Sequence, residues 1–167
     1  MEEKQGAPGR SESDTERLDR NFNELLQELR VSQTGVQILF AFLLTLPFTQ
    51  RFTEVTDFQK DVYFTTLLLA ACASVLFIGP VSWHRVLFRR QEKGEVVFAA
   101  NWMAIGGLVC LSLAIIGVIL FITDFLFSST AAAVASGCIA GMIVVLWYTL
   151  PLIRLIRIMQ RDRPNGD

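Results

Sequence analysis

Long apolar runs alternate with short polar segments along this chain, and their length indicates membrane-spanning helices. Four such runs, each of twenty residues or more and with at most one charged side chain, cover residues 31–50, 61–83, 96–123 and 130–153. A hydrocarbon core of about 30 Å takes about 20 residues of helix to cross. The pattern therefore predicts an all-α fold of four transmembrane helices in an antiparallel bundle.

A second apolar pattern begins ahead of the first run and predicts that the first helix extends N-terminally. Apolar residues recur there at spacings of three, four or seven: Leu18, Phe22, Leu25, Leu29, Val36, Phe40 and Leu43. Because this stripe keeps its phase across residue 31, we expect one helix over residues 15–50 whose first turns form an amphipathic cytoplasmic segment. We expect Pro80 to kink the second helix and Gly94 to end its extension beyond the membrane.

These patterns divide the chain into three parts. Residues 1–14 are rich in Gly, Ser and charged side chains and are expected to form a disordered tail. The four-span membrane domain covers residues 15–158, and residues 159–167 form a cytoplasmic C-terminal tail. The hydrophobic share of 52% and the charged share of 19% favour a membrane protein over a soluble domain of this length.

The basic residues are distributed unevenly, and this predicts the orientation. Thirteen of the fifteen Lys and Arg side chains precede the first span, lie between the second and third, or follow the fourth, whereas the other two connections hold only Arg51 and Lys60. The positive-inside rule then places both termini in the cytoplasm. The net charge of −1 gives no reason to expect nucleic-acid binding.

Small residues on the third and fourth spans predict helix packing, because helices in lipid associate through close approach. The two stripes consist of Gly106, Cys110 and Ala114, and of Ser129, Ala133, Gly137 and Gly141. We expect these faces to meet within one chain, since the short connection makes the two helices neighbours. The alternative is a dimer seam along Ala133, Gly137 and Gly141.

Polar residues form a separate stripe at the start of the first span. Gln33, Thr34 and Gln37 share one side of the helix, and an unpaired amide facing hydrocarbon costs several kcal/mol. We therefore expect both glutamines to face the bundle interior or the inner interface. One interpretation is that they bond to Asn101 and Ser82 and hold helices together; the other is a polar vestibule lined by Gln33, Thr34, Gln37 and Asn101.

Three residues near the mouth of such a vestibule can titrate. Glu24 and Glu28 lie one turn apart, and pairing with Arg20 or Arg17 is the simpler expectation. His84 is the only histidine and can titrate near neutral pH, although an interfacial side chain next to Trp83 is the simpler interpretation.

The sequence shows no catalytic, metal or cofactor motif. It contains no nucleophile motif, phosphate loop or cluster of His, Cys and Asp, so we expect neither an enzyme nor a bound cofactor. The cysteines Cys72, Cys110 and Cys138 fall inside predicted spans and match no metal spacing, which indicates small apolar packing residues.

Three segments carry a resemblance to a known family. They are ELLQELRVSQTGVQILFAFLLTLPFTQRF at residues 24–52, DFQKDVY at 57–63 and HRVLFRR at 84–90. They resemble a bacterial family of small integral membrane proteins of uncharacterised function, some of whose members are automatically labelled sodium:proton antiporters. The likeness covers about residues 16–122, with ELRVSQTGVQ as its specific segment, and implies several spans in a bacterial plasma membrane.

The antiporter label conflicts with the chemistry of the spans. A cation/proton exchanger needs an ionisable group at depth, and none of the four runs has one in its middle. We therefore expect a non-enzymatic accessory or structural helix bundle that contacts lipid and either a second copy of itself or a membrane partner protein. A small oligomeric transporter or channel, which uses the stripe around Gln33 and Gln37, is the alternative.

Overall fold

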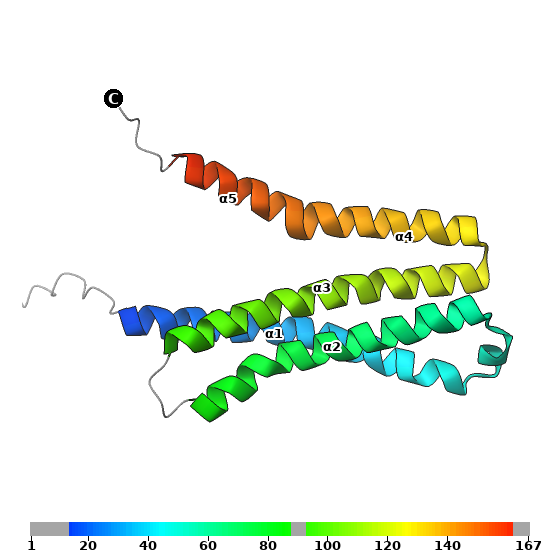
Figure 1. The fold of residues 1–167 in the computed structure, drawn as a ribbon, viewed down its shortest axis with the longest axis horizontal. Helices are drawn as coiled ribbons and strands as arrows, with labels where there is room; N and C mark the ends of the chain where they lie inside the picture. Colours follow the sequence, from blue (N-terminus) through cyan, green and yellow to red (C-terminus); the bar gives the residue numbers. More distant parts are fainter. Residues whose placement is uncertain (1–13, 88–92, 162–167) are drawn as a thin grey trace, which may run out of the picture.

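The computed structural model describes residues 14–87 and 93–161, and this part of the chain is helical and contains no strand (Figure 1). The long helices are α1 (Asp14–Thr45), α2 (Asp57–Leu87) and α3 (Lys93–Leu126). The last helix consists of α4 (Ser129–Ile143), the π-helical turn η3 (Val144–Thr149) and α5 (Leu150–Arg161). Two short 3₁₀ turns, η1 (Leu46–Phe48) and η2 (Gln50–Glu54), connect α1 to α2.

Four helical segments are long and apolar enough to cross a membrane, which confirms the predicted all-α fold with four spans. They are Glu24–Phe48, Asp57–Trp83, Phe98–Leu126 and Ser129–Gln160. Most of the expected tails, residues 1–13 and 162–167, lies outside the described residues, whereas Asp14 begins α1 and residues 159–161 belong to α5. We call the end of the bundle where α1 begins and α5 ends the terminal side, and the opposite end the hairpin side.

The helices do not contribute equally to the bundle. The α2 and α3 helices pack along most of their length, α1 lies mainly against α2, and α4 contacts α3 alone among the described long helices. Figure 1 shows α4 beside α3 near the hairpin side, with α5 leading away from it. The core therefore lies among α1, α2 and α3, and the last helix is attached to its edge.

The apolar stripe of α1 faces this core as predicted. Leu29, Val36 and Leu43, spaced seven residues apart, are at most 5% exposed. They join two apolar clusters, one around Phe77 and one around Tyr63. A helix with a repeat of seven presents one narrow stripe to its neighbours, so the remaining faces of α1 point away from the bundle.

The predicted end of the first helix is too late, because Pro47 interferes with it. The α-helix stops at Thr45, and the chain continues in 3₁₀ turns. Proline has no backbone N–H, so the carbonyl of Leu43 lacks its partner four residues on. The buried hydroxyl of Tyr63 donates a hydrogen bond to that carbonyl at 3.0 Å and ties α2 to the end of α1.

Gly94 does not end the second helix, contrary to the expectation from sequence. The α2 helix ends at Leu87, and Gly94 lies in the first turn of α3. A helix start tolerates glycine because the first N–H groups have no partner within the helix in any case. Pro80 is buried inside α2, which continues through it as one helix.

The small residues of α3 pack against α2, not α4. A Cβ atom on Gly107 would collide with the ring of Phe77, and one on Gly117 with the side chain of Thr66. Gly106 approaches Leu76 in the same interface, and Ala114 joins the cluster around Tyr63. Cys110 is half-buried against the cluster around Phe77. The α3 stripe is thus occupied by large side chains of α2.

The expectation that the small-residue stripes of α3 and α4 meet each other within one chain is therefore wrong. On α4 the buried residues are Ala132, Ser136 and Ile143, whereas Ala133, Gly137 and Gly141 are exposed. Ala132 and Ser136 each come one residue before a member of the stripe. The face of α4 that contacts α3 is therefore turned by about 100° from the stripe. No atom outside the local helix lies within 4 Å of a Cβ built on Gly137 or Gly141. The dimer seam along this stripe stays a prediction.

Candidate functional site

The polar stripe of α1 lies outside the core of the single chain. Gln37 and Thr34 are exposed and Gln33 is half-buried, because their face is turned away from the Leu29, Val36 and Leu43 stripe. The Thr34 hydroxyl donates a hydrogen bond to the carbonyl of Arg30 at 3.0 Å, and the Thr45 hydroxyl donates to that of Phe42 at 2.7 Å. The hydroxyls are thus satisfied by their own helix.

The two glutamine amides have no such internal partner. Among the described residues, no side chain or backbone group hydrogen-bonds to the amide of Gln33 or Gln37. Asn101 and Ser82 are exposed on other helices and form no hydrogen bond with them. No hydrogen bond among the described residues thus joins Gln33, Gln37 and Asn101 into one cluster, and the vestibule stays a prediction.

The depth of Gln37 makes its exposure unusual. The α1 span ends at Phe48, beside Pro47. At about 1.5 Å per residue, Gln37 lies roughly 15 Å inward from Pro47, which is the middle of a hydrocarbon core of about 30 Å. By the same count Gln33 is roughly 21 Å inward and is closer to the headgroups of the terminal side.

The candidate titrating residues are not gathered around this stripe. Glu24 lies near Arg20, with 3.9 Å between its carboxylate and the guanidinium, and both side chains are more than half exposed. The Glu28 side chain is exposed, and its backbone carbonyl accepts a hydrogen bond from Ser32. His84 lies on α2, but its side chain falls outside the described residues.

A second polar cluster lies on the hairpin side. The Gln59 side chain, 7% exposed, donates a hydrogen bond to the carboxylate of Asp124 at 2.9 Å and accepts one from the backbone N–H of Thr56 at 3.0 Å. The Thr56 hydroxyl in turn accepts a hydrogen bond from the backbone N–H of Gln59. This is a capping box that also connects α2 to the end of α3.

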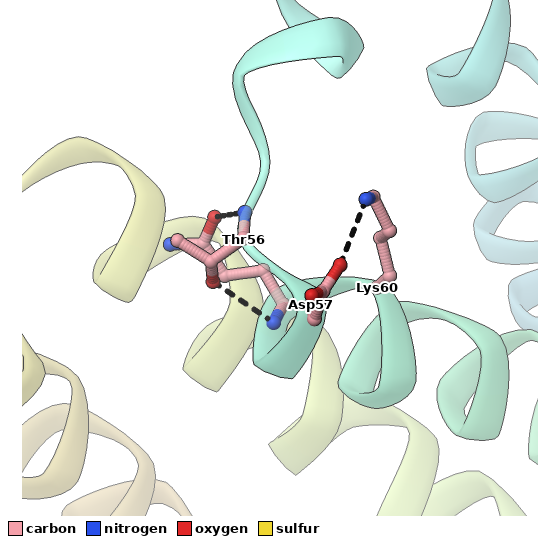
Figure 2. A network of polar contacts seen from close by, with 4 residues as sticks. Thr56, Asp57 and Lys60 are labelled. Carbon is pink, nitrogen blue, oxygen red and sulfur yellow. Dashed lines mark hydrogen bonds and ion pairs between the residues drawn. The ribbon is translucent and has the colours of Figure 1, made fainter.

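The capping box was missed in the sequence, although its signal is present there. Thr56 followed three residues later by Gln59 and then by an apolar run is the expected pattern. Figure 2 shows Thr56 next to the exposed ion pair between Lys60 and Asp57, whose atoms lie 3.0 Å apart. Thr56, Gln59 and Asp124 hydrogen-bond to one another and connect α2 to α3, whereas the Lys60–Asp57 pair lies within α2.

The π-helical turn η3 joins the last helix to α3. The Tyr148 hydroxyl lies 3.1 Å from the Ser112 hydroxyl on α3, and Ser112 also donates to its own helix through the Leu108 carbonyl. Within η3, the N–H of Leu150 bonds to the carbonyl of Val145, five residues back, and Pro151 follows at once. A wider turn of this kind accommodates the missing N–H and the ring of proline.

The described residues contain no group of three or more His, Cys, Asp or Glu side chains that could hold a metal ion. Gln37, whose amide is exposed, and the half-buried Gln33 are polar residues within the first candidate span. They offer hydrogen-bond donors and acceptors but no group that transfers a proton at neutral pH.

Comparisons with known proteins identify one family and assign no activity. The model of a family of unknown function, DUF6328, matches residues 11–151. No curated protein and no solved structure gave a match. The family match supports the expectation of an uncharacterised family, and it lends no support to the antiporter label.

Proposed function

Because the chain belongs to this family of unknown function, we propose its function from its own surface: a non-enzymatic accessory or structural membrane protein that assembles through the polar face of α1. The observation that carries the proposal is the exposed amide of Gln37, which has no hydrogen-bond partner among the described residues. The length of the span puts this amide near mid-bilayer depth. Leaving such a group unbonded in hydrocarbon costs several kcal/mol. An interhelical hydrogen bond from a second helix removes most of this cost.

The surroundings of Gln37 suit close approach by another helix. Ala41 and Thr45 follow it at intervals of four residues on the same exposed face. Small side chains at this spacing allow two helix backbones to come close in a membrane. The buried stripe of α1 is already occupied by α2, so the polar face is free to receive a partner without opening the bundle.

A second copy of this chain is the partner that fits best. A primary amide carries both a donor and an acceptor, so Gln37 of one copy can bond to Gln37 of another across a two-fold axis. Such a pair satisfies both amides with no further polar group. The assembly is then a homodimer with α1 at its centre.

The positions of charged groups argue against the alternative of a proton-coupled transporter. In the four candidate spans, the Asp, Glu, Lys and Arg side chains lie within about seven residues of either end. Proton relays use ionisable groups inside the membrane. A glutamine amide cannot take that role.

Cysteine cross-linking in membranes tests the proposal. In a chain lacking its three native cysteines, Ala41→Cys should give a cross-linked dimer, and Leu68→Cys, on an exposed face of α2, should not. Adding Gln37→Leu should weaken the Ala41→Cys cross-link, and Gln37→Asn, which keeps an amide, should largely retain it. Absence of the dimer at Ala41, or a dimer that is insensitive to Gln37→Leu, would overturn the proposal.

A further inference from the structure

The α5 helix has two chemically different faces and lies apart from the other helices. One face holds Arg154, Arg157 and Gln160, which line an open hollow of about 580 Å³ together with Ile158. The opposite face holds apolar residues spaced three, one and three apart: Leu152, Leu155, Ile156 and Met159. All of these side chains are exposed, and among the described elements α5 contacts only η3.

Arg154 and Arg157 of α5 have no partner among the described residues. Neither Arg154 nor Arg157 forms an ion pair with a described residue, and α5 itself contains no Asp or Glu. An arginine guanidinium binds phosphate through two parallel N–H donors. Two of them less than one turn apart, beside an amide, form a surface suited to a phosphate group.

The length of the last helix places this surface among lipid headgroups. The segment Ser129–Gln160 has 32 residues, which is about 48 Å of helix against a hydrocarbon core of about 30 Å. Arg154 lies roughly 37 Å along the helix from Ser129, at the outer edge of a headgroup layer that extends about 5–7 Å beyond the core. Arg157 follows at roughly 42 Å and remains in this layer when α5 tilts toward the membrane plane. Trp147 is exposed and precedes α5 by one turn, in the position of an interfacial aromatic residue.

The joint at η3 and Pro151 lets α5 lean toward this layer. π turns and prolines are the usual places where a helix changes direction. Figure 1 shows α5 continuing from α4 at an angle and away from α3. The apolar face has no protein to cover it in the described chain, and the acyl region directly below the headgroups can cover it.

We infer that α5 binds the headgroup phosphate of anionic phospholipid on the terminal side. Arg154 and Arg157 hold the phosphate, Gln160 donates a further hydrogen bond, and the Leu152 and Leu155 face enters the acyl boundary. The inference does not depend on the role proposed for α1. A phosphate site of this kind differs from a signal that only sets membrane orientation, for which lysine serves as well as arginine.

Native mass spectrometry of the full chain with added lipid tests this inference. The protein should retain phosphatidylglycerol in preference to phosphatidylcholine, and Arg154→Gln/Arg157→Gln should weaken retention about 25-fold, since each basic residue near an anionic surface contributes about fivefold. Arg154→Lys/Arg157→Lys should weaken it by a smaller factor while cysteine labelling shows the same topology. Arg51→Gln, a matched exposed arginine near the hairpin side, should change nothing.

Two further measurements distinguish the ligand source and guard against unfolded variants. Excess inorganic phosphate should not displace the lipid; displacement would mean that free phosphate is the ligand and would overturn the lipid assignment. A fluorescent label on Leu155→Cys in the chain without native cysteines should be quenched by shallow nitroxide phospholipids and shielded from iodide. Equal retention of both lipids by the parent chain, or quenching by iodide alone, would overturn the inference.

Discussion

Replacing Tyr63 by Phe tests whether the second helix supplies the hydrogen bond that Pro47 removes from the first. The substitution deletes one hydroxyl and keeps the ring, whose centroid lies 5.1 Å from that of Phe52 and 5.9 Å from that of Phe121. The Leu43 carbonyl, which now accepts from Tyr63 at 3.0 Å, is left without a partner at a buried position. A buried acceptor without a partner costs about 1–3 kcal/mol, and interhelical bonds in membranes reach about 1.7 kcal/mol, so we expect a loss of about 1–2 kcal/mol.

A second substitution makes this prediction specific. Pro47→Ala restores a backbone N–H four residues after Leu43, where it can bond to the same carbonyl. In the Pro47→Ala background, Tyr63→Phe should therefore lose less stability than in the parent chain. The coupling between the two changes, measured as a double-mutant cycle, should recover about half of the loss or more.

The assay is the temperature at which the folded protein disappears from the size-exclusion peak after heating in mild detergent. A loss of 1–2 kcal/mol corresponds to a shift of roughly 2–8 °C for a chain of this size. If Tyr63→Phe melts with the parent, or if its effect is the same with and without Pro47, the hydrogen bond does not compensate for the proline and our account of this junction fails.

Four further predictions concern packing, topology and transport. Gly107→Ala should lower stability by about 1–3 kcal/mol because the added methyl group meets a buried ring, whereas Gly137→Ala, with open space around it, should change stability by less than about 0.5 kcal/mol. Gln59→Leu should cost about 1–2 kcal/mol in the same heating assay through loss of the capping box and of the link to α3. In intact cells Thr56→Cys should react with an impermeant thiol reagent and Gln160→Cys should not, in the chain without native cysteines. Liposomes containing the purified protein should show the same proton and sodium flux as empty ones, and protein-dependent flux would favour the transporter alternative.

The helices were predictable because their signals are local. Apolar runs of twenty residues or more marked all four spans, and the spacing of Leu29, Val36 and Leu43 identified the buried face of α1. The end of α1 was placed too late because the apolar run continues past Pro47, although the proline itself was a sufficient signal. The capping box at Thr56 and Gln59 was equally legible.

The pairing of helices was not predictable in the same way, because it depends on which neighbouring helix has side chains that fit a given face. Gly107 and Gly117 receive Phe77 and Thr66 of α2, and this contact uses the small-residue face of α3. The α4 helix also packs against α3, and its buried residues are Ala132, Ser136 and Ile143. Spacing of small residues indicates that a face can be approached closely, and it does not identify the helix that approaches.

The location of the polar stripe follows from a conflict between two faces of one helix. The sequence argument placed Gln37 toward the bundle because an amide avoids hydrocarbon. Leu29, Val36 and Leu43 also favour a place in the core. Gln37 points about 100° away from them around the helix, so α1 cannot bury both faces against the same neighbours. The described chain buries the apolar face and leaves the Gln37 amide exposed, without a hydrogen-bond partner among the described residues. The assembly that we propose would supply a hydrogen-bond partner for this amide without disturbing the apolar contacts of α1.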